Sequence, residues 1–238
     1  RPRCLYRKIS STTLSRFTVP TVAAVLDPSC ESRFNSFVAY RRTPAVQQRL
    51  DAQREAIADA AVSLLSERGY QGLSIAAVAE RAGVATGSVY RHYADKSELM
   101  VRIFRSLCGR EVDAVVAAAD AARPDGAAAQ VAAVVETFAR RALRNPTLAY
   151  ALLAEPVDAA VDAERLVLRR AFAAAFEDAL RRGVDSGDLT SRNPALSAAA
   201  LVGAVGEVLT GPLQSGVAAT DTVPELVAFA LRALGARP

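Results

Sequence analysis

Side chains able to form hydrogen bonds, stack or carry positive charge are concentrated in one short stretch of the sequence. They are Thr86, Ser88, Tyr90, Arg91, His92, Tyr93 and Lys96. Gly87 among them has no side chain, and its value would be close approach of the backbone. A helix face that meets only water usually carries Glu, Lys and Ala instead of such a mixture. Hydroxyl and guanidinium groups can read the edges of bases, while aromatic and cationic groups can contact the phosphate backbone. The chemistry predicted here is non-covalent recognition of DNA. The alternative is a structural corner in an ordinary all-α protein.

Two short helices joined by a glycine corner are predicted to hold this stretch. Ile75, Val78 and Ala79 recur at helical spacing and give the first helix one apolar stripe. Gly83 can adopt the left-handed conformation that a sharp corner between helices needs. Val89 then anchors a second helix whose other face carries the polar groups. This order is the helix-turn-helix pattern, whose second helix enters the major groove of DNA.

Capping signals predict the helices on either side of this motif. A first helix is expected from about residue 44 to 68, and Gly69 closes it as a C-terminal cap. Asp95 and Glu98 form a D-x-x-E start, in which the Asp95 carboxylate accepts from first-turn amides. The helix that begins there should continue to near Ala119.

Three stretches of this region resemble the N-terminal domain of TetR/AcrR-type bacterial repressors. They are AERAGV at 79–84, SVYRHY at 88–93 and DKSEL at 95–99. The resemblance covers about residues 46–105, and beyond it only helical architecture and length are similar. It implies a repressor that binds a palindromic double-stranded DNA operator as a homodimer. It also implies release from DNA by a small-molecule inducer, which the sequence does not identify.

The resemblance also implies roles for individual residues. The positions expected to contact DNA are Ser74, Thr86, Gly87, Ser88, Tyr90, Arg91, His92, Tyr93 and Lys96. Ser74 opens the helix that carries Ile75 and Val78, where a hydroxyl and free amides can hold a phosphate. Arg91 would contact the DNA backbone or read guanine through two hydrogen bonds. Tyr93 could equally be a core residue that fixes the second helix. His92, the single histidine, is expected to donate to a phosphate because it has no partners for a metal site.

The charge distribution points the same way as the motif. Residues 1–37 hold six basic and two acidic groups, a balance of +4 that equals the net charge of the whole chain. Residues 38–105 carry 10 basic and 7 acidic groups, whereas residues 106–238 carry 13 and 16. A basic N-terminal region beside an acidic C-terminal one suits a DNA-reading domain attached to a body that stays off the phosphates.

Three regions are predicted from these patterns. Residues 1–43 mix Ser, Thr, Pro and Arg without helical period, and we expect them to be disordered or a non-native extension, with Val38 as a possible true start. A targeting signal is the competing explanation for this segment. Residues 44–105 should form the helix-turn-helix domain. Residues 106–238 should form a domain for ligand sensing and dimerisation.

The C-terminal region reads as a series of helices, which makes the chain all-α with about nine helices. The expected helices span 127–144, 146 to about 154, 161–184, 194–209 and 222 to near 235. Asn145-Pro146 and Asn193-Pro194 each supply a cap and a proline at the first helical position. Thr222 and Glu225 have the spacing of a capping box for the last helix.

Two surfaces of this region are predicted to be functional. A dimer interface is expected on the last two helices, at Ala199, Gly203, Gly206, Leu209, Leu226 and Phe229, because small residues one turn apart allow another helix to approach closely. An inducer pocket is expected among Phe104, Phe138, Tyr150, Leu152, Phe172 and Phe176. The alternative for both sets is that they are internal core residues.

The sequence gives little support to an enzyme. The only histidine lies in the DNA-reading stretch, and no HExxH, P-loop or dinucleotide-binding pattern is found, so we expect no catalytic residues, metal or cofactor. The three cysteines lack CxxC spacing, which argues against a disulfide framework or a zinc site and favours a cytoplasmic protein. No apolar run reaches the ~18 residues of a membrane span. A helical ligand-binding or adaptor protein without operator binding remains the main alternative.

Overall fold

The computed structural model describes residues 43–190 and 193–236, and the regular elements in that part of the chain are all helical. They are α1 (Pro44–Arg68), α2 (Ile75–Arg81), α3 (Thr86–Tyr90), α4 (Lys96–Ala121), the 3₁₀ helix η2 (Arg123–Asp125), α5 (Ala127–Arg144), α6 (Pro146–Leu153), α7 (Ala159–Ser186), α8 (Pro194–Ser215) and α9 (Thr222–Ala233). The predicted all-α fold with about nine helices is confirmed. The expected extension, except for Thr43, and the proposed start at Val38 lie outside the described residues.

Short-range capping explains where the N-terminal helices begin and end. The Gly69 N–H donates to the Leu65 carbonyl with φ at 68°, a conformation open to glycine, and α1 ends there as predicted. The D-x-x-E start of α4 is reciprocal, because the Glu98 N–H donates to Asp95 at 2.8 Å and the Ala94 N–H donates to Glu98 at 2.7 Å.

Two Asn-Pro pairs begin C-terminal helices as predicted. The Asn145 side chain accepts from the Leu148 N–H at 3.1 Å at the start of α6. The Asn193 side chain accepts from the Leu196 N–H at 3.0 Å at the start of α8. Because proline lacks an N–H, it takes the first helical position of each helix without losing a hydrogen bond.

The structure differs from the prediction in the capping of one helix and in the length of two others. The capping box at Thr222 does not form: Asp221 is the N-cap residue of α9, and it makes no side-chain capping bond. Helix α8 does not stop at Leu209 but continues through Pro212 to Ser215, because burial of Leu213 in the core offsets the hydrogen bond that Pro212 cannot donate. Helix α7 is two residues longer at each end than predicted, since Asp158 accepts from the Ala160 and Val161 amides and Gly187 ends the helix in the left-handed conformation.

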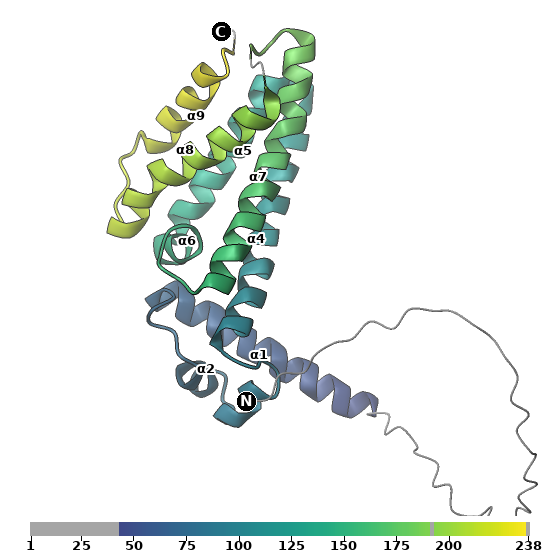
Figure 1. The fold of residues 1–238 in the computed structure, drawn as a ribbon, viewed down its shortest axis with the longest axis vertical. Helices are drawn as coiled ribbons and strands as arrows, with labels where there is room; N and C mark the ends of the chain where they lie inside the picture. The colour runs from purple at the N-terminus through teal and green to yellow at the C-terminus, as the bar shows by residue number, and fades with distance from the viewer. Residues whose placement is uncertain (1–42, 191–192, 237–238) are drawn as a thin grey trace, which may run out of the picture. The chain divides into compact units, whose positions relative to one another are not determined.

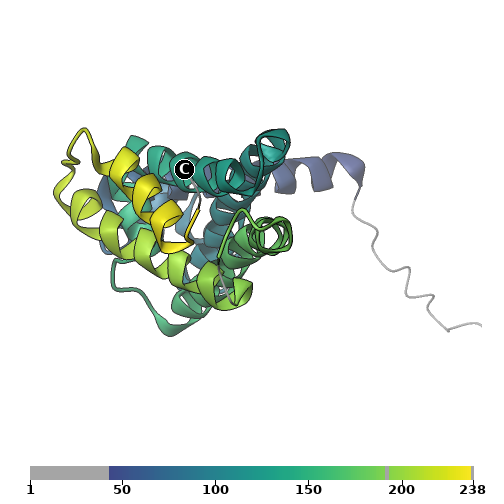
Figure 2. The same cartoon turned by 90° about the horizontal axis from the view of Figure 1, so that it is seen from above.

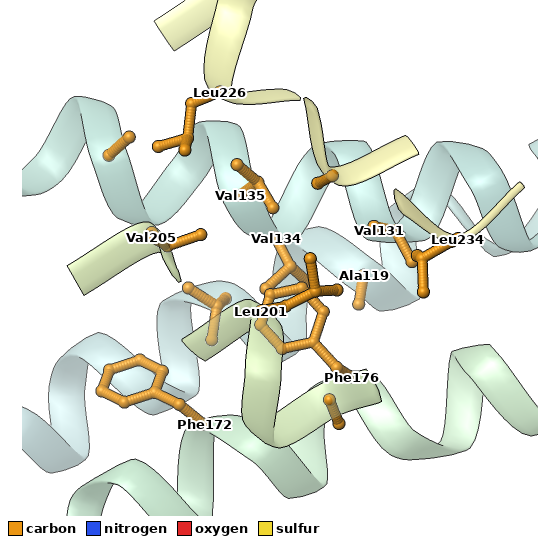
Figure 3. Close-up of a cluster of buried hydrophobic side chains, with 14 of the residues drawn as sticks. Ala119, Val131, Val134, Val135, Phe172, Phe176, Leu201, Val205, Leu226 and Leu234 are labelled. Atoms are coloured by element: carbon orange, nitrogen blue, oxygen red, sulfur yellow. The ribbon is translucent and has the colours of Figure 1, made fainter. Parts of the chain in front are cut away.

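The buried apolar side chains form two cores. The N-terminal core joins α1, α2, α3 and the first half of α4 to Ala151 of α6 and Val161 of α7. The C-terminal core joins the second half of α4 to α5, α7, α8 and α9, whose side chains meet in Figure 3. Helix α4 therefore contributes to both cores and runs unbroken through the domain boundary predicted between residues 105 and 106.

The helices that form the C-terminal core lie side by side. Helix α4 packs against α5 and α7, and these three run along the same direction in Figure 1, with α1 and α2 near one end of them. Helices α8 and α9 lie together at one side in the view of Figure 2. Helix α1 also packs against α6, so the two cores meet where α1, α4, α6 and α7 come together.

Candidate DNA-reading surface and ligand cavity

The corner between α2 and α3 has the geometry that the sequence predicts. The Ser74 hydroxyl caps α2 by accepting from the Ala77 N–H at 3.2 Å. Gly83 has φ of 66°, and the next amide, that of Val84, donates to the Ala79 carbonyl at 3.0 Å. Val89 is fully buried and fixes α3 on the N-terminal core. The turn and one apolar anchor thus hold α3 in a defined orientation.

Four of the predicted DNA contacts are exposed on and next to α3. They are Thr86, Gly87, Tyr90 and Arg91. The Tyr90 side chain is 53% exposed, although a tyrosine is more commonly half-buried. A Cβ added to Gly87 would meet no atom within 4 Å, so the space beside this backbone is open to a large partner. Donors, acceptors and an aromatic ring therefore face outward together.

Ser88 does not belong to this exposed face. It is only 9% exposed, and its hydroxyl accepts from Arg91 Nη2 at 2.7 Å. The contact fixes the Arg91 side chain along α3, because three residues place both groups on the same side of the helix. In this geometry the Ser88 hydroxyl is engaged with Arg91, and its contact with base edges stays a prediction.

Two further predicted contacts face the protein. Tyr93 is 4% exposed and packs in the N-terminal core, where burial raises the pKa of its hydroxyl. His92 Nε2 lies 3.0 Å from Gln53 Oε1 of α1, which ties the end of α3 to α1. Burial, followed by the nearby Arg54 and Arg91 charges, lowers the pKa of the imidazole. The neutral ring donates from Nε2 to Gln53 Oε1 and has no second N–H for a phosphate.

Lys96 is also engaged within the protein. Its ammonium donates to the Tyr70 carbonyl at 2.9 Å and lies 4.1 Å from the centre of the Tyr70 ring. Burial lowers the pKa of Lys96. The predicted phosphate contact would therefore share this ammonium with the turn after α1, because only its remaining N–H donors are available to DNA.

A polar cluster at the meeting point of the two cores was missed by the sequence analysis. We call it the junction cluster; its residues are Tyr70, Lys96, Ser97, Glu155, Asp158 and Arg165. The buried Glu155 carboxylate accepts from the Tyr70 and Gln71 amides at 2.7 and 3.0 Å. Asp158 accepts from the Tyr70 and Ser97 hydroxyls. The sequence does show Glu155 and Asp158 close together. Their partners Tyr70, Gln71 and Ser97, however, lie more than 60 residues away in the chain.

Arg165 connects the junction cluster to the C-terminal region. It is 8% exposed, and its guanidinium donates to the backbone carbonyls of Ala151, Leu152 and Glu155 at 2.8, 3.0 and 2.5 Å. These bonds hold the connection between α6 and α7 in place. Burial lowers the pKa of this guanidinium, which nevertheless stays charged at neutral pH.

A cavity of about 540 Å³ lies among α4, α5, α6, α7 and α8. Four of the predicted pocket residues line it: Phe138, Leu152, Phe172 and Phe176. Phe104 and Tyr150 do not. Phe104 is fully buried in the N-terminal core, and Tyr150 packs against the C-terminal core. The volume falls within the range of small-molecule sites.

The residues predicted for the dimer interface divide into two groups. Ala199, Gly203 and Phe229 are exposed, and Gly206 is partly exposed. Leu209 and Leu226 are 0% and 3% exposed and pack in the C-terminal core. These two side chains pack within one chain, and their part in an interface stays a prediction. Gly203 and Gly206 also line the cavity.

The structure offers no metal centre in the part of the chain that it describes. No group of three or more His, Cys, Asp or Glu side chains in residues 43–190 and 193–236 is arranged to hold an ion. Cys108 is a buried free thiol, and burial raises its pKa to about 12, which keeps it protonated and unreactive.

Known proteins share the N-terminal sequence of this chain. Residues 57–103 match the family model described as bacterial regulatory proteins, tetR family. The HTH-type transcriptional repressor KstR of Mycolicibacterium smegmatis is 36% identical over 107 residues, which cover 43% of this chain and 50% of that repressor. The chain thus spans about half the length of the curated relatives that it matches.

Solved structures share the fold over a larger part of the chain. The fatty acid degradation regulator FadR of Bacillus halodurans has a TM-score of 0.63 at 19% identity, and the match covers 77% of this chain and 99% of that one. The transcriptional regulator FadR of Bacillus subtilis in complex with stearoyl-CoA has a TM-score of 0.58 at 20% identity, covering 76% and 95%. At this identity the likeness shows the fold alone. Residues 57–103, within the helix-turn-helix region, are thus similar to the tetR family of bacterial regulatory proteins.

Proposed function

We propose that the chain is a sequence-specific DNA-binding transcriptional regulator that acts in the cytoplasm as a repressor. The observation that carries this proposal is the outward face formed by Thr86, Gly87, Tyr90 and Arg91 on a helix held by a buried anchor. Side chains of this kind can reach base edges and phosphates when α3 lies in the major groove. The similarity of 107 residues of the chain to a repressor supports this proposal.

The proposal includes a small molecule that controls DNA binding. A cavity of about 540 Å³ is large enough for such a ligand, and a structural relative carries stearoyl-CoA. Arg165 lines the cavity and donates to the Glu155 carbonyl. The Glu155 carboxylate in turn accepts from the Tyr70 amide, just after α1. A ligand that displaced α7 would therefore act on the orientation of the DNA-reading helices.

The proposal also includes a homodimer formed through α8 and α9. Contrary to the expectation from the sequence, helix α8 is long and apolar enough to cross a membrane by length and composition, and only 28% of its most apolar window is buried. Val208 on α8 and Phe229 on α9 are 48% and 44% exposed. A second copy of the chain would cover this apolar surface, and two-fold symmetry would suit a palindromic operator.

An electrophoretic mobility shift on DNA from upstream of the chain's own coding sequence tests the proposal. We expect Arg91→Ala and Thr86→Ala to change which sequence is preferred, since these side chains face the bases. Arg140→Ala removes the same charge from α5 and should leave binding unchanged. Binding that is equally strong in all three variants would show that α3 is not the reading helix.

The main alternative is a helical ligand-binding or adaptor protein that has no operator. It predicts no shift of any promoter fragment above non-specific binding, and a cavity ligand that binds without affecting DNA. Selection of bound fragments from random DNA separates the two, because only a regulator enriches a defined sequence.

A further inference from the structure

The charged side chains that line the cavity balance one another. The acidic ones are Glu111, Asp162 and Glu207, and the basic ones are Arg141, Arg165 and Arg169. Arg141 donates from Nε and Nη2 to the two Glu111 oxygens at 2.5 and 2.8 Å. This two-point pair satisfies the guanidinium edge that would otherwise recognise a carboxylate or phosphate. Arg165 is similarly occupied by three backbone carbonyls.

The remaining charges lie where water screens them. Asp162, Arg169 and Glu207 are exposed, so their charges contribute little to binding. The interior is apolar, with buried lining residues Leu107, Val134, Val135, Phe172, Phe176 and Val205. A charged group placed there would lose its hydration without gaining a counter-ion.

Two neutral polar groups in the lining remain able to bind a ligand. The Asn145 carbonyl oxygen caps α6, which leaves its amide N–H groups as donors. The Thr210 hydroxyl donates to the Gly206 carbonyl at 2.9 Å, which leaves its oxygen as an acceptor. These groups suit a hydroxyl or a carbonyl, and neither compensates a full charge.

We propose that the cavity selects an uncharged molecule with a large apolar body and at most a few neutral polar groups. A carboxylate would have to displace Glu111 from Arg141, and an ammonium would have to displace Arg141 from Glu111. Either exchange breaks the two-point pair, and the displaced partner, whose side chain is 30% or 35% exposed, receives water in place of an ion. This inference rests on the ligand-responsive part of the proposed function and adds the chemical class of the ligand.

Three probes of equal chain length test this selectivity in the full chain. They are 1-decanol, decanoate and decylammonium, each titrated calorimetrically below its micelle concentration. We expect 1-decanol to bind at least ~10-fold more tightly than either ion, since a charge is costly to bury without a partner. An ion that binds as tightly as the alcohol, or the absence of binding by all three probes, would overturn the inference.

Variants of the Glu111–Arg141 pair test whether this pair sets the selectivity. Glu111→Gln leaves Arg141 without a counter-charge and should shift the preference toward decanoate by ~10-fold. Arg141→Gln should shift the preference toward decylammonium. This variant tests the ion pair even if Glu111→Gln does not fold. Glu177→Gln is the matched control, because it removes the same charge from a pair with Arg181 outside the lining and should keep the wild-type order.

The titrations contain no DNA, so their outcome is separate from that of the mobility shift. A chain that binds 1-decanol selectively but no operator would contradict the proposed regulator while supporting this inference. A chain that binds its operator and prefers decanoate would support the proposed regulator and contradict this inference. Unchanged preferences in both pair variants would show that the Glu111–Arg141 pair does not set the selectivity.

Discussion

Individual polar residues near α3 divide into those that face outward and those that hold the domain together. Tyr90 and Arg91 are exposed, whereas Tyr93, His92 and Lys96 contact α1 or the turn that follows it. The same residue types serve both purposes, because a hydroxyl, an imidazole or an ammonium bonds equally well to a phosphate or to a neighbouring carbonyl.

The protonation of His92 can be measured directly because it is the only histidine of the chain. Burial is the first cause that lowers its pKa below the ordinary value of 6.5, followed by the Arg54 and Arg91 charges. The unfolded chain therefore binds the proton more readily than the folded one. The stability that His92 contributes should be present above about pH 6.5 and be lost as the pH falls through the folded pKa.

An NMR titration of the His92 ring protons should give a pKa below 6.5. Melting temperatures at several pH values should show a smaller loss between pH ~7 and ~5.5 in His92→Gln than in the wild type. A ring that titrates above 6.5 would mean that its burial beside Arg54 and Arg91 does not persist in solution.

Glu155 should contribute more to stability than any exposed carboxylate. Its side chain satisfies two backbone amides and is only 7% exposed, so Glu155→Ala leaves those N–H groups buried without acceptors. We expect the free energy of unfolding to fall by about 2–4 kcal/mol in chemical denaturation. Glu136→Ala on α5, where the carboxylate is 47% exposed, should change it by less than ~0.5 kcal/mol. Equal effects of the two substitutions would contradict this stabilising role of the Glu155 carboxylate.

Among the helices, two glycines differ in how much space surrounds them. A Cβ added to Gly183 in α7 would lie 2.5 Å from Leu189 and 2.6 Å from Ala127, so this helix needs glycine where α5 approaches it. A Cβ added to Gly109 in α4 would meet nothing within 4 Å. Gly183→Ala should therefore destabilise the protein by about 1–3 kcal/mol. Gly109→Ala should stabilise it by about 0.5–1 kcal/mol, because alanine loses less backbone entropy. Thermal unfolding of both variants measures the difference, and a destabilised Gly109→Ala would show that α4 has a close neighbour at that position.

Helices could be predicted from the sequence wherever their signals are local. Asn145 and Asn193 cap helices from positions next to them, and Gly69 ends α1 through its own backbone conformation. The end of α8 could not be predicted, because it depends on the burial of Leu213 against helices distant in sequence. The capping box at Thr222 failed for a similar reason, since its spacing matched but the preceding Asp221 begins the helix.

The sequence predicted where the exposed face of α3 lies, but not which residues belong to it. The helix-turn-helix spacing identified α3 and its exposed face. Whether His92 or Lys96 faces DNA depends on Gln53 and Tyr70, which lie 39 and 26 residues away in the chain. Such contacts leave no spacing pattern, and the junction cluster around Glu155 was missed for the same reason.

At the scale of the whole molecule, the exposed apolar surface of α8 and α9 should hold two chains together. Phe229→Asp places a charge on that surface, and its burial in a dimer without a partner is costly. We expect light scattering to show a monomer or a weakened dimer, and operator affinity to fall because two recognition helices ~34–36 Å apart are lost.

Val116→Asp is the control for this experiment, because Val116 is similarly exposed, at 39%, but lies on α4. It should leave the dimer intact. If Phe229→Asp remains a full dimer with unchanged helical content, the interface lies on another face of the molecule.

The junction cluster has a consequence for how this protein can evolve. Glu155 accepts from the backbone amides of Tyr70 and Gln71, and Arg165 donates to backbone carbonyls, so these bonds use groups that every residue type except proline supplies. Gly69 is restricted in addition, since a Cβ there would come within 2.7 Å of Glu155 Oε2. Descendants of the chain could therefore exchange the residues that read DNA or line the cavity, acquiring new operators and new ligands, while the link between the two regions is inherited unchanged.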